Sequence, residues 1–166
     1  MGSFGLEAAG HYRFAYGLRF ATTLIYLLLE WRFLRAPTAG RPLARKLRVA
    51  VLFLLGGYLA IALFPEYRVG LLHLTLVGGF AVIALIVATR VVFGHSGNLA
   101  RLERRNRWLS VAVGLMWFGM ITRISGDFWP KIMPTHYSYG ALAWIAGVLV
   151  WAFNVLPLVL VTDPED

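Results

Sequence analysis

The chain has 166 residues, of which 59% are hydrophobic and 14% charged, and its mean hydropathy is +0.69. This composition excludes an ordinary soluble domain and indicates an integral membrane protein. The formal net charge of +8 does not indicate nucleic-acid binding, because the basic residues gather in short stretches between apolar blocks. The sequence has no cysteine, which excludes disulfides, cysteine-ligated clusters and haem attached through cysteine.

Apolar blocks of the length needed to cross about 30 Å of hydrocarbon predict an all-α, polytopic membrane bundle of about five transmembrane helices. No stretch indicates a second domain, so residues 1–166 are expected to form a single transmembrane helical domain. In chain order, the expected spans are Tyr12 to Leu34, Leu47 to Phe64, Val69 to Phe93, Trp108 to Ile124 and His136 to Val161.

Two connections between the expected spans are strongly basic. The first carries Arg35, Arg41, Arg45, Lys46 and Arg48, and the second carries Arg101, Arg104, Arg105 and Arg107. Lys and Arg in short loops resist translocation, so both connections are expected on the cytoplasmic side. This predicts an outside N-terminus and a cytoplasmic C-terminus.

The four histidines take defined places on this topology. His11, His73 and His136 fall at the outer ends of three different expected helices, where they could converge on one metal ion or supply axial ligands to a haem. His95 follows His73 by 22 positions, roughly 33 Å along a regular helix, and is expected at a second, cytoplasmic-side site or structural cap beside Arg90. The alternative is that these imidazoles only hydrogen-bond to lipid headgroups or loop carbonyls.

Arginines within the expected spans need anionic partners. Arg19 and Arg123 lie in the outer half of the bundle, where the positive-inside rule does not recruit them. A haem propionate, Asp127 or a lipid phosphate could each meet such a guanidinium. Near the inner ends, Arg90 could pair with Glu30 across the bundle.

The glycines and methionines in the expected helices are interpreted first as packing residues. Glycines in the expected helices allow close helix approach, notably Gly56, Gly57, Gly78, Gly79, Gly114 and Gly119. Methionines usually fill space in apolar helices, although a thioether can also bind Cu(I). Those considered as ligands are Met116, Met120 and Met133.

Two motifs resemble those of a known family. The first is His73-Leu74-Thr75-Leu76-Val77-Gly78-Gly79, and the second is Thr89-Arg90-Val91-Val92-Phe93-Gly94-His95-Ser96-Gly97. With the later Arg123, Pro157 and the acidic tail Asp163-Pro164-Glu165-Asp166, they are similar to the NnrS family of bacterial membrane proteins linked to the nitric oxide response. The likeness covers roughly Val69 to Asp166 and about half of a family member.

The resemblance implies a multi-pass protein of the bacterial inner membrane that binds haem and copper, with His73 and His95 matching the motif histidines. We therefore expect a non-covalent, b-type haem, with copper as a second candidate cofactor, and a role in nitric oxide response or membrane electron transfer. The expected metal ligands are His73, His136 and His11. The expected propionate partners are Arg19 and Arg123.

Two other functions stay open at this point. One is a non-catalytic membrane subunit of a larger respiratory or photosynthetic complex, and the other is a small anion transporter in which Arg19 meets the substrate. The expected partners are the lipid bilayer and either further copies of the chain or the other subunits of such a complex, with no nucleic acid.

Overall fold

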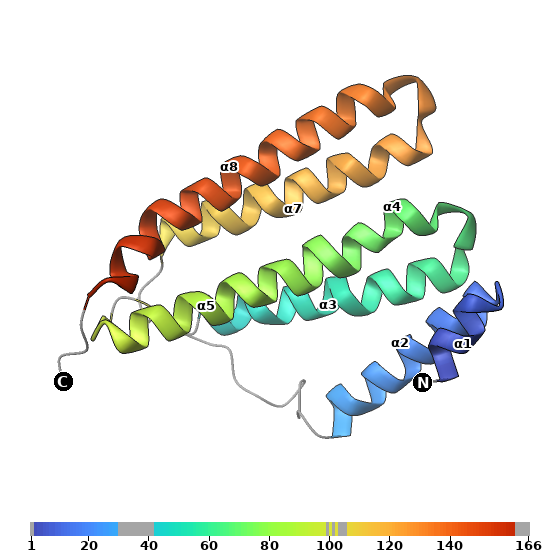
Figure 1. The fold of residues 1–166 in the computed structure, drawn as a ribbon, viewed down its shortest axis with the longest axis horizontal. Coiled ribbons are helices and arrows are strands. Elements are labelled where there is room, and N and C mark those ends of the chain that lie inside the picture. The colour runs from blue at the N-terminus through green and yellow to red at the C-terminus, as the bar shows by residue number, and fades with distance from the viewer. Residues whose placement is uncertain (1, 30–41, 99, 101, 103–105, 162–166) are drawn as a thin grey trace.

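The computed structural model describes residues 2–29, 42–98, 100, 102 and 106–161, and its regular elements in these residues are all helices (Figure 1). This confirms the all-α fold class. The elements are α1 (Gly2–Ala8), α2 (Tyr12–Leu29), α3 (Pro42–Leu63), η1 (Pro65–Tyr67), α4 (Arg68–His73), η2 (Leu74–Ala81), α5 (Val82–His95), α7 (Arg107–Phe128), η3 (Pro130–Ile132) and α8 (Met133–Val159).

Four helical stretches among the described residues are long and apolar enough to cross a membrane. They correspond to the second to fifth expected spans and comprise Pro42–Leu63, Pro65–His95, Arg107–Phe128 and Pro130–Val159. The first expected span coincides with α2 up to Leu29, while its residues 30–34 lie outside the described part of the chain. A fifth span and the orientation of the termini therefore stay predictions.

The long helices form two antiparallel hairpins that lie side by side (Figure 1). One pairs α3 with the continuous helix α4–η2–α5, and the other pairs α7 with α8. Prolines start both connections: Pro65 opens η1 and Pro130 opens η3, each at a first helical position where its missing N–H costs nothing. The shorter pair α1–α2 packs against α3.

A left-handed glycine ends α1 and turns the chain into α2. Gly10 has a φ of 81°, and the next residue, His11, donates its backbone N–H to the Leu6 carbonyl at 2.8 Å. This is the glycine cap that satisfies the last carbonyls of a helix. It folds α1 back onto α2, where Glu7 reaches residues of the neighbouring helices.

The middle of the third expected span is π-helical rather than α-helical. Segment η2 runs for 8 residues directly after His73, and π-helical turns in proteins often mark functional sites. Trp117 of α7 donates its indole N–H to the Gly78 carbonyl at 3.2 Å, which fixes the segment against its neighbour. Because a π-helix turns differently from an α-helix, the faces of His73 and His95 cannot be related by regular helical geometry, although both lie on one continuous helix.

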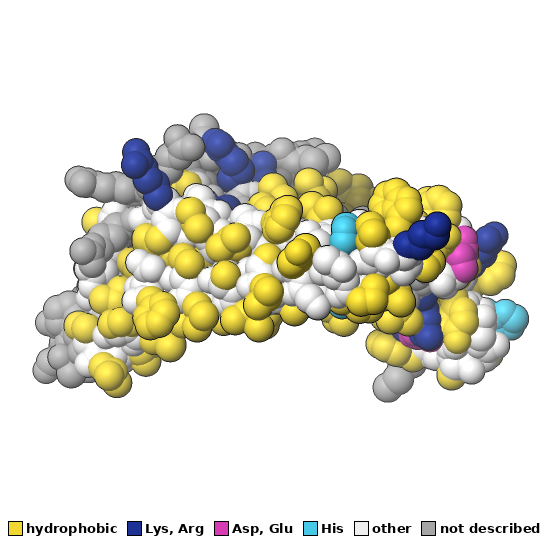
Figure 2. Space-filling model, turned by 90° about the horizontal axis from the view of Figure 1, so that it is seen from above, with side chains coloured by type: hydrophobic (Ala, Val, Ile, Leu, Met, Phe, Trp, Pro, Cys, Tyr) yellow, Lys and Arg dark blue, Asp and Glu magenta, His cyan; other side chains and the backbone are white. Residues whose placement is uncertain are grey.

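Most of the outer surface is suited to lipid. Figure 2 shows hydrophobic side chains across the middle of one face, with Lys and Arg toward both ends and acidic side chains at one end. Large apolar residues project from several helices, including Phe14 (73% exposed), Val69 (64%) and Phe153 (77%). In water such a surface would be an aggregation liability, whereas in a bilayer it is the expected exterior.

The α7–α8 contact depends on backbone approach at glycines. A Cβ added at Gly119 would lie 2.6 Å from the Gly140 carbonyl oxygen, and one added at Gly140 would lie 2.8 Å from the Gly119 carbonyl oxygen. Gly114, on the same helix α7, has nothing within 4 Å of an added Cβ.

We therefore expect Gly119→Ala to lower the free energy of unfolding in detergent by about 1–3 kcal/mol, because the new methyl group forces the backbones apart. Gly114→Ala is the matched control and should leave stability unchanged or slightly raised. Equal melting temperatures for the two variants in a thermal unfolding assay would contradict this interpretation.

Candidate functional site

A cavity of about 410 Å³ has two walls. One wall is formed by the end of α4 and by η2, and the other by the α7–α8 hairpin. Its polar lining consists of His73, Arg123 and Tyr137, and Met120 adds a thioether sulfur. Gly119 and Gly140 also line it, so the close contact of α7 with α8 leaves part of the wall without side chains. The remaining lining is mainly apolar and comprises Val77, Ala141, Trp144 and Ile145.

His73 is the last residue of α4 and is half-buried at the wall of this cavity. Its Nδ1 lies 3.1 Å from the Gly70 carbonyl oxygen and 3.2 Å from that of Val69. A carbonyl only accepts, so Nδ1 carries the proton and donates it. In the neutral ring Nε2 then keeps its lone pair, which is the arrangement that a metal-ligating histidine requires.

The anionic partner of Arg123 is Asp127. It is one of the three partners that the sequence left open, the others being a haem propionate and a lipid phosphate. Nη1 of Arg123 donates to Oδ1 of Asp127 at 2.8 Å, one turn along α7. The Tyr137 hydroxyl of α8 donates to the same carboxylate oxygen, and the guanidinium carbon lies 3.3 Å from the centroid of the Tyr137 ring. Gly70 of α4 has no side chain where Asp127 packs against it, so this carboxylate meets three helices.

The sequence model of the family described as NnrS protein matches residues 3–162. The chain belongs to the NnrS family. The match starts at Ser3, so it extends well before Val69, where the motif resemblance alone was expected to start. No curated protein and no solved structure matches the chain.

Within this NnrS chain, the two motif histidines lie on one helical stretch, Pro65–His95, with His73 in its first third and His95 at its end. His73 faces the cavity, whereas His95 ends α5 and is exposed, far from His73 along the bundle (Figure 1). Arg90 is exposed on α5, and Glu30, its expected partner, lies outside the described residues.

The other two histidines have different surroundings. His136 of α8 is half-buried, and its Nδ1 lies 2.8 Å from the Ser125 hydroxyl, which itself donates to the Thr122 carbonyl. A hydroxyl has one proton, so His136 Nδ1 is the donor to Ser125. His11 is exposed between α1 and α2.

No group of three or more His, Asp or Glu side chains in the described ranges could hold a metal ion. The three-histidine metal site built from His11, His73 and His136 therefore stays a prediction. The two residues on the expected list that share a cavity are His73 and Arg123.

A second polar cluster surrounds Arg19. Nη2 of Arg19 donates to Oε2 of Glu7 at 2.5 Å, while Arg68 and the Tyr16 hydroxyl both donate to Oε1 of the same carboxylate, at 3.1 and 2.9 Å. The guanidinium of Arg19 also stacks on the Phe4 ring, 4.4 Å from its centroid.

Glu7 was not singled out in the sequence, although it is the one acidic residue before Glu30. This could have identified Glu7 from the sequence, because the guanidinium of Arg19 lies within an apolar helix and needs a nearby carboxylate partner. Arg19 thus has a carboxylate partner within the protein.

The charge state of Glu7 is set by competing effects. Burial acts to raise its pKa, but hydrogen bonds from Arg19 and Tyr16 and the charges of Arg19 and Arg68 outweigh burial and hold the pKa below the ordinary 4.5. A carboxyl whose pKa is lowered by folding stabilises the folded state above its unfolded pKa. That contribution is lost as the pH falls through the folded value.

We therefore expect α1 to stay docked on α2 near neutral pH and to loosen when the pH is lowered below 4.5. Hydrogen exchange of the α1 amides, measured across this range in detergent, should show protection lost on acidification. Glu7→Gln should remove both the protection and its pH dependence. Glu66→Gln, at an exposed glutamate in η1, is the control and should behave as the unmodified chain.

Proposed function

We propose that this chain is a haem-binding membrane protein of the NnrS type, acting in nitric oxide response or membrane electron transfer. The observation that carries the proposal is His73, which lines a cavity between three helices with Nδ1 committed to backbone carbonyls and Nε2 left as a ligand atom. The proposed setting is the bacterial inner membrane, with the N-terminus outside and the C-terminus cytoplasmic.

The residues around the cavity suit a haem. Its volume of about 410 Å³ falls within the range of small-molecule and cofactor sites, and its walls are mostly apolar. His73 would supply a nitrogen ligand to the iron and Met120 a thioether sulfur. Arg123 already donates to Asp127 through Nη1, and its remaining N–H groups would meet a propionate. When bound, a haem supplies an iron that takes up one electron or binds a diatomic gas.

Copper is the second proposed cofactor. His73 and Met120 combine an imidazole with a soft thioether, which is a donor pair suited to Cu(I). No group of three or more His, Asp or Glu among the described residues could hold a metal ion, so haem, which needs only one or two protein ligands, has the stronger support.

The two rival functions have weaker support from the site. The anion-transporter hypothesis relied on the charge of Arg19, and that charge is matched by Glu7 at 2.5 Å. The hypothesis of a subunit within a larger complex has only the exposed apolar faces in its support, and these suit lipid as well as protein partners.

A visible spectrum of the purified protein in detergent, oxidised and reduced, tests the proposal. A Soret band is expected, and His73→Ala should abolish or shift it, because the substitution removes the proposed ligand atom. His95→Ala is the control and should leave the band unchanged. If the protein shows no Soret band and elemental analysis finds no copper, the proposal of a redox cofactor is wrong.

A comparison of the two buried methionines of α7 can distinguish a haem ligand from a residue that only packs. Met120 and Met116 are 1% and 0% exposed, but of the two only Met120 lines the cavity of His73. If Met120 ligates the haem, Met120→Leu should shift the reduced-state absorption bands and lower the reduction potential, because a thioether favours the reduced iron. Met116→Leu should change neither. Identical spectra and potentials for both variants would show that Met120 only fills space.

A further inference from the structure

Three exposed arginines at one end of the bundle have no partner in the described part of the chain. We call this end, where α3 and α7 begin and α5 ends, the basic end. No carboxylate among the described residues pairs with the guanidinium groups of these arginines. The three are Arg45 of α3, Arg90 of α5 and Arg107 of α7.

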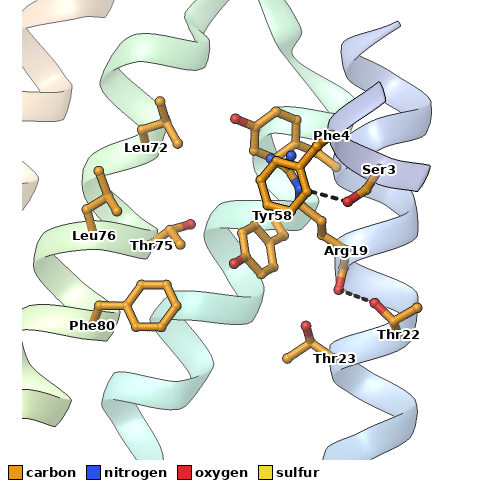
Figure 3. Close-up of a pocket in the computed structure, with 11 residues that line it drawn as sticks. Ser3, Phe4, Arg19, Thr22, Thr23, Tyr58, Leu72, Thr75, Leu76 and Phe80 are labelled. Carbon is orange, nitrogen blue, oxygen red and sulfur yellow. Dashed lines mark hydrogen bonds between the residues drawn. The ribbon is translucent and has the colours of Figure 1, made fainter. Parts of the chain in front are cut away.

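The half-buried arginines of the opposite end differ, because the fold itself supplies their counter-charges. Figure 3 shows Arg19 turned into the fold, where its Nε donates to the Ser3 hydroxyl at 3.4 Å, and its Nη2 pairs with Glu7. Arg123 likewise has a carboxylate partner. The acidic residues of the described ranges all lie at this opposite end, and they are Glu7, Glu66 and Asp127. The described part of the fold therefore offers no anion to the arginines of the basic end.

The three arginines of the basic end lie at one depth. Leu43 of α3 and Trp108 of α7 both pack against the apolar cluster that contains Phe93 of α5. The rings of Phe93 and Trp108 are stacked, with centroids 6.0 Å apart. Each arginine lies within three positions of one of these residues, which is less than one helical turn. The guanidinium groups thus surround the basic end at a common level.

Arg90 lies on a lipid-facing part of α5. It belongs to a stretch that is long and apolar enough to span the membrane, and its neighbours Val87 and Val91 are 51% and 50% exposed. It precedes His95, the last residue of α5, by five positions, about 7 Å along the helix. An arginine side chain can extend over that length and bring its charge to the headgroup level. The anion that the bilayer offers at this level is a lipid phosphate.

We infer that the basic end binds the headgroups of anionic phospholipids, with Arg90 as a phosphate ligand on the lipid-facing surface of α5. A guanidinium presents a fork of N–H donors that matches two phosphate oxygens. A zwitterionic headgroup carries its own cation beside the phosphate, so a surface whose described charges are all positive favours a headgroup with net negative charge. Binding of this kind goes beyond orienting the chain during insertion, which requires positive charge but no bound lipid. The surface is independent of the proposed haem site at His73.

The test counts the lipids that the full chain retains in detergent, by native mass spectrometry, after addition of phosphatidylglycerol or phosphatidylcholine. Preferential retention of phosphatidylglycerol is expected. Arg90→Gln should lower its association constant about fivefold, the contribution of one basic residue near a membrane surface, and should leave phosphatidylcholine unaffected. Arg90→Lys keeps the charge and should keep most of the preference. Arg13→Gln, at an exposed arginine of α2 near the opposite end, is the matched control and should bind phosphatidylglycerol as the unmodified chain does.

A phosphatidylglycerol with a photoreactive headgroup provides a measurement that does not depend on the variants. Cross-links in the unmodified chain should fall near Arg45, Arg90 or Arg107 and should be removed by excess phosphatidylglycerol. Equal retention of the two lipids, equal losses from Arg90→Gln and Arg13→Gln, or cross-links confined to the opposite end would each overturn the inference. Sodium phosphate and sodium chloride of equal ionic strength should weaken retention equally. A stronger effect of phosphate would assign the arginines to soluble phosphate and overturn the inference as well.

Discussion

The structure depends on close backbone approach between helices that gain little from apolar burial, since lipid is as apolar as their side chains. Gly119 and Gly140 bring α7 and α8 together, with carbonyl oxygens only 2.6 and 2.8 Å from where a Cβ would lie. Gly78 and Gly79 of η2 serve the same purpose against Met120 and Leu54. Gly119 and Gly140 line the cavity of His73, so part of the shape of this cavity follows from where side chains are missing.

Charge matching is the second constraint on this fold. An unpaired guanidinium is costly near the hydrocarbon, and Arg19 and Arg123 each find a carboxylate inside the protein. Asp127 is additionally held by Tyr137 and packs against Gly70, so the pair ties α4, α7 and α8 together beside His73. Glu7 does the same for α1, α2 and the start of α4. These pairs place a polar end on an otherwise apolar bundle.

The π-helical segment η2 lies between two cavities. It begins directly after His73, and Val77 lines the proposed haem site, while Thr75 and Phe80 line a second cavity, of about 330 Å³, on the other side of the segment. The hydroxyl of Thr75 is packed against the α3 backbone at Gly57, where a side chain is missing.

The sequence by itself determined the membrane class, the four helices from Pro42 onward and the NnrS family, because hydropathy, length and local motifs are properties of the chain. It could not place Glu7 against Arg19, since that contact requires α1 to fold back at Gly10. It also predicted close packing for all six glycines, although Gly56 and Gly114 meet no neighbour within 4 Å. Which side chains share a cavity depends on helix rotation and on the π-helical segment, and only packing in three dimensions decides these.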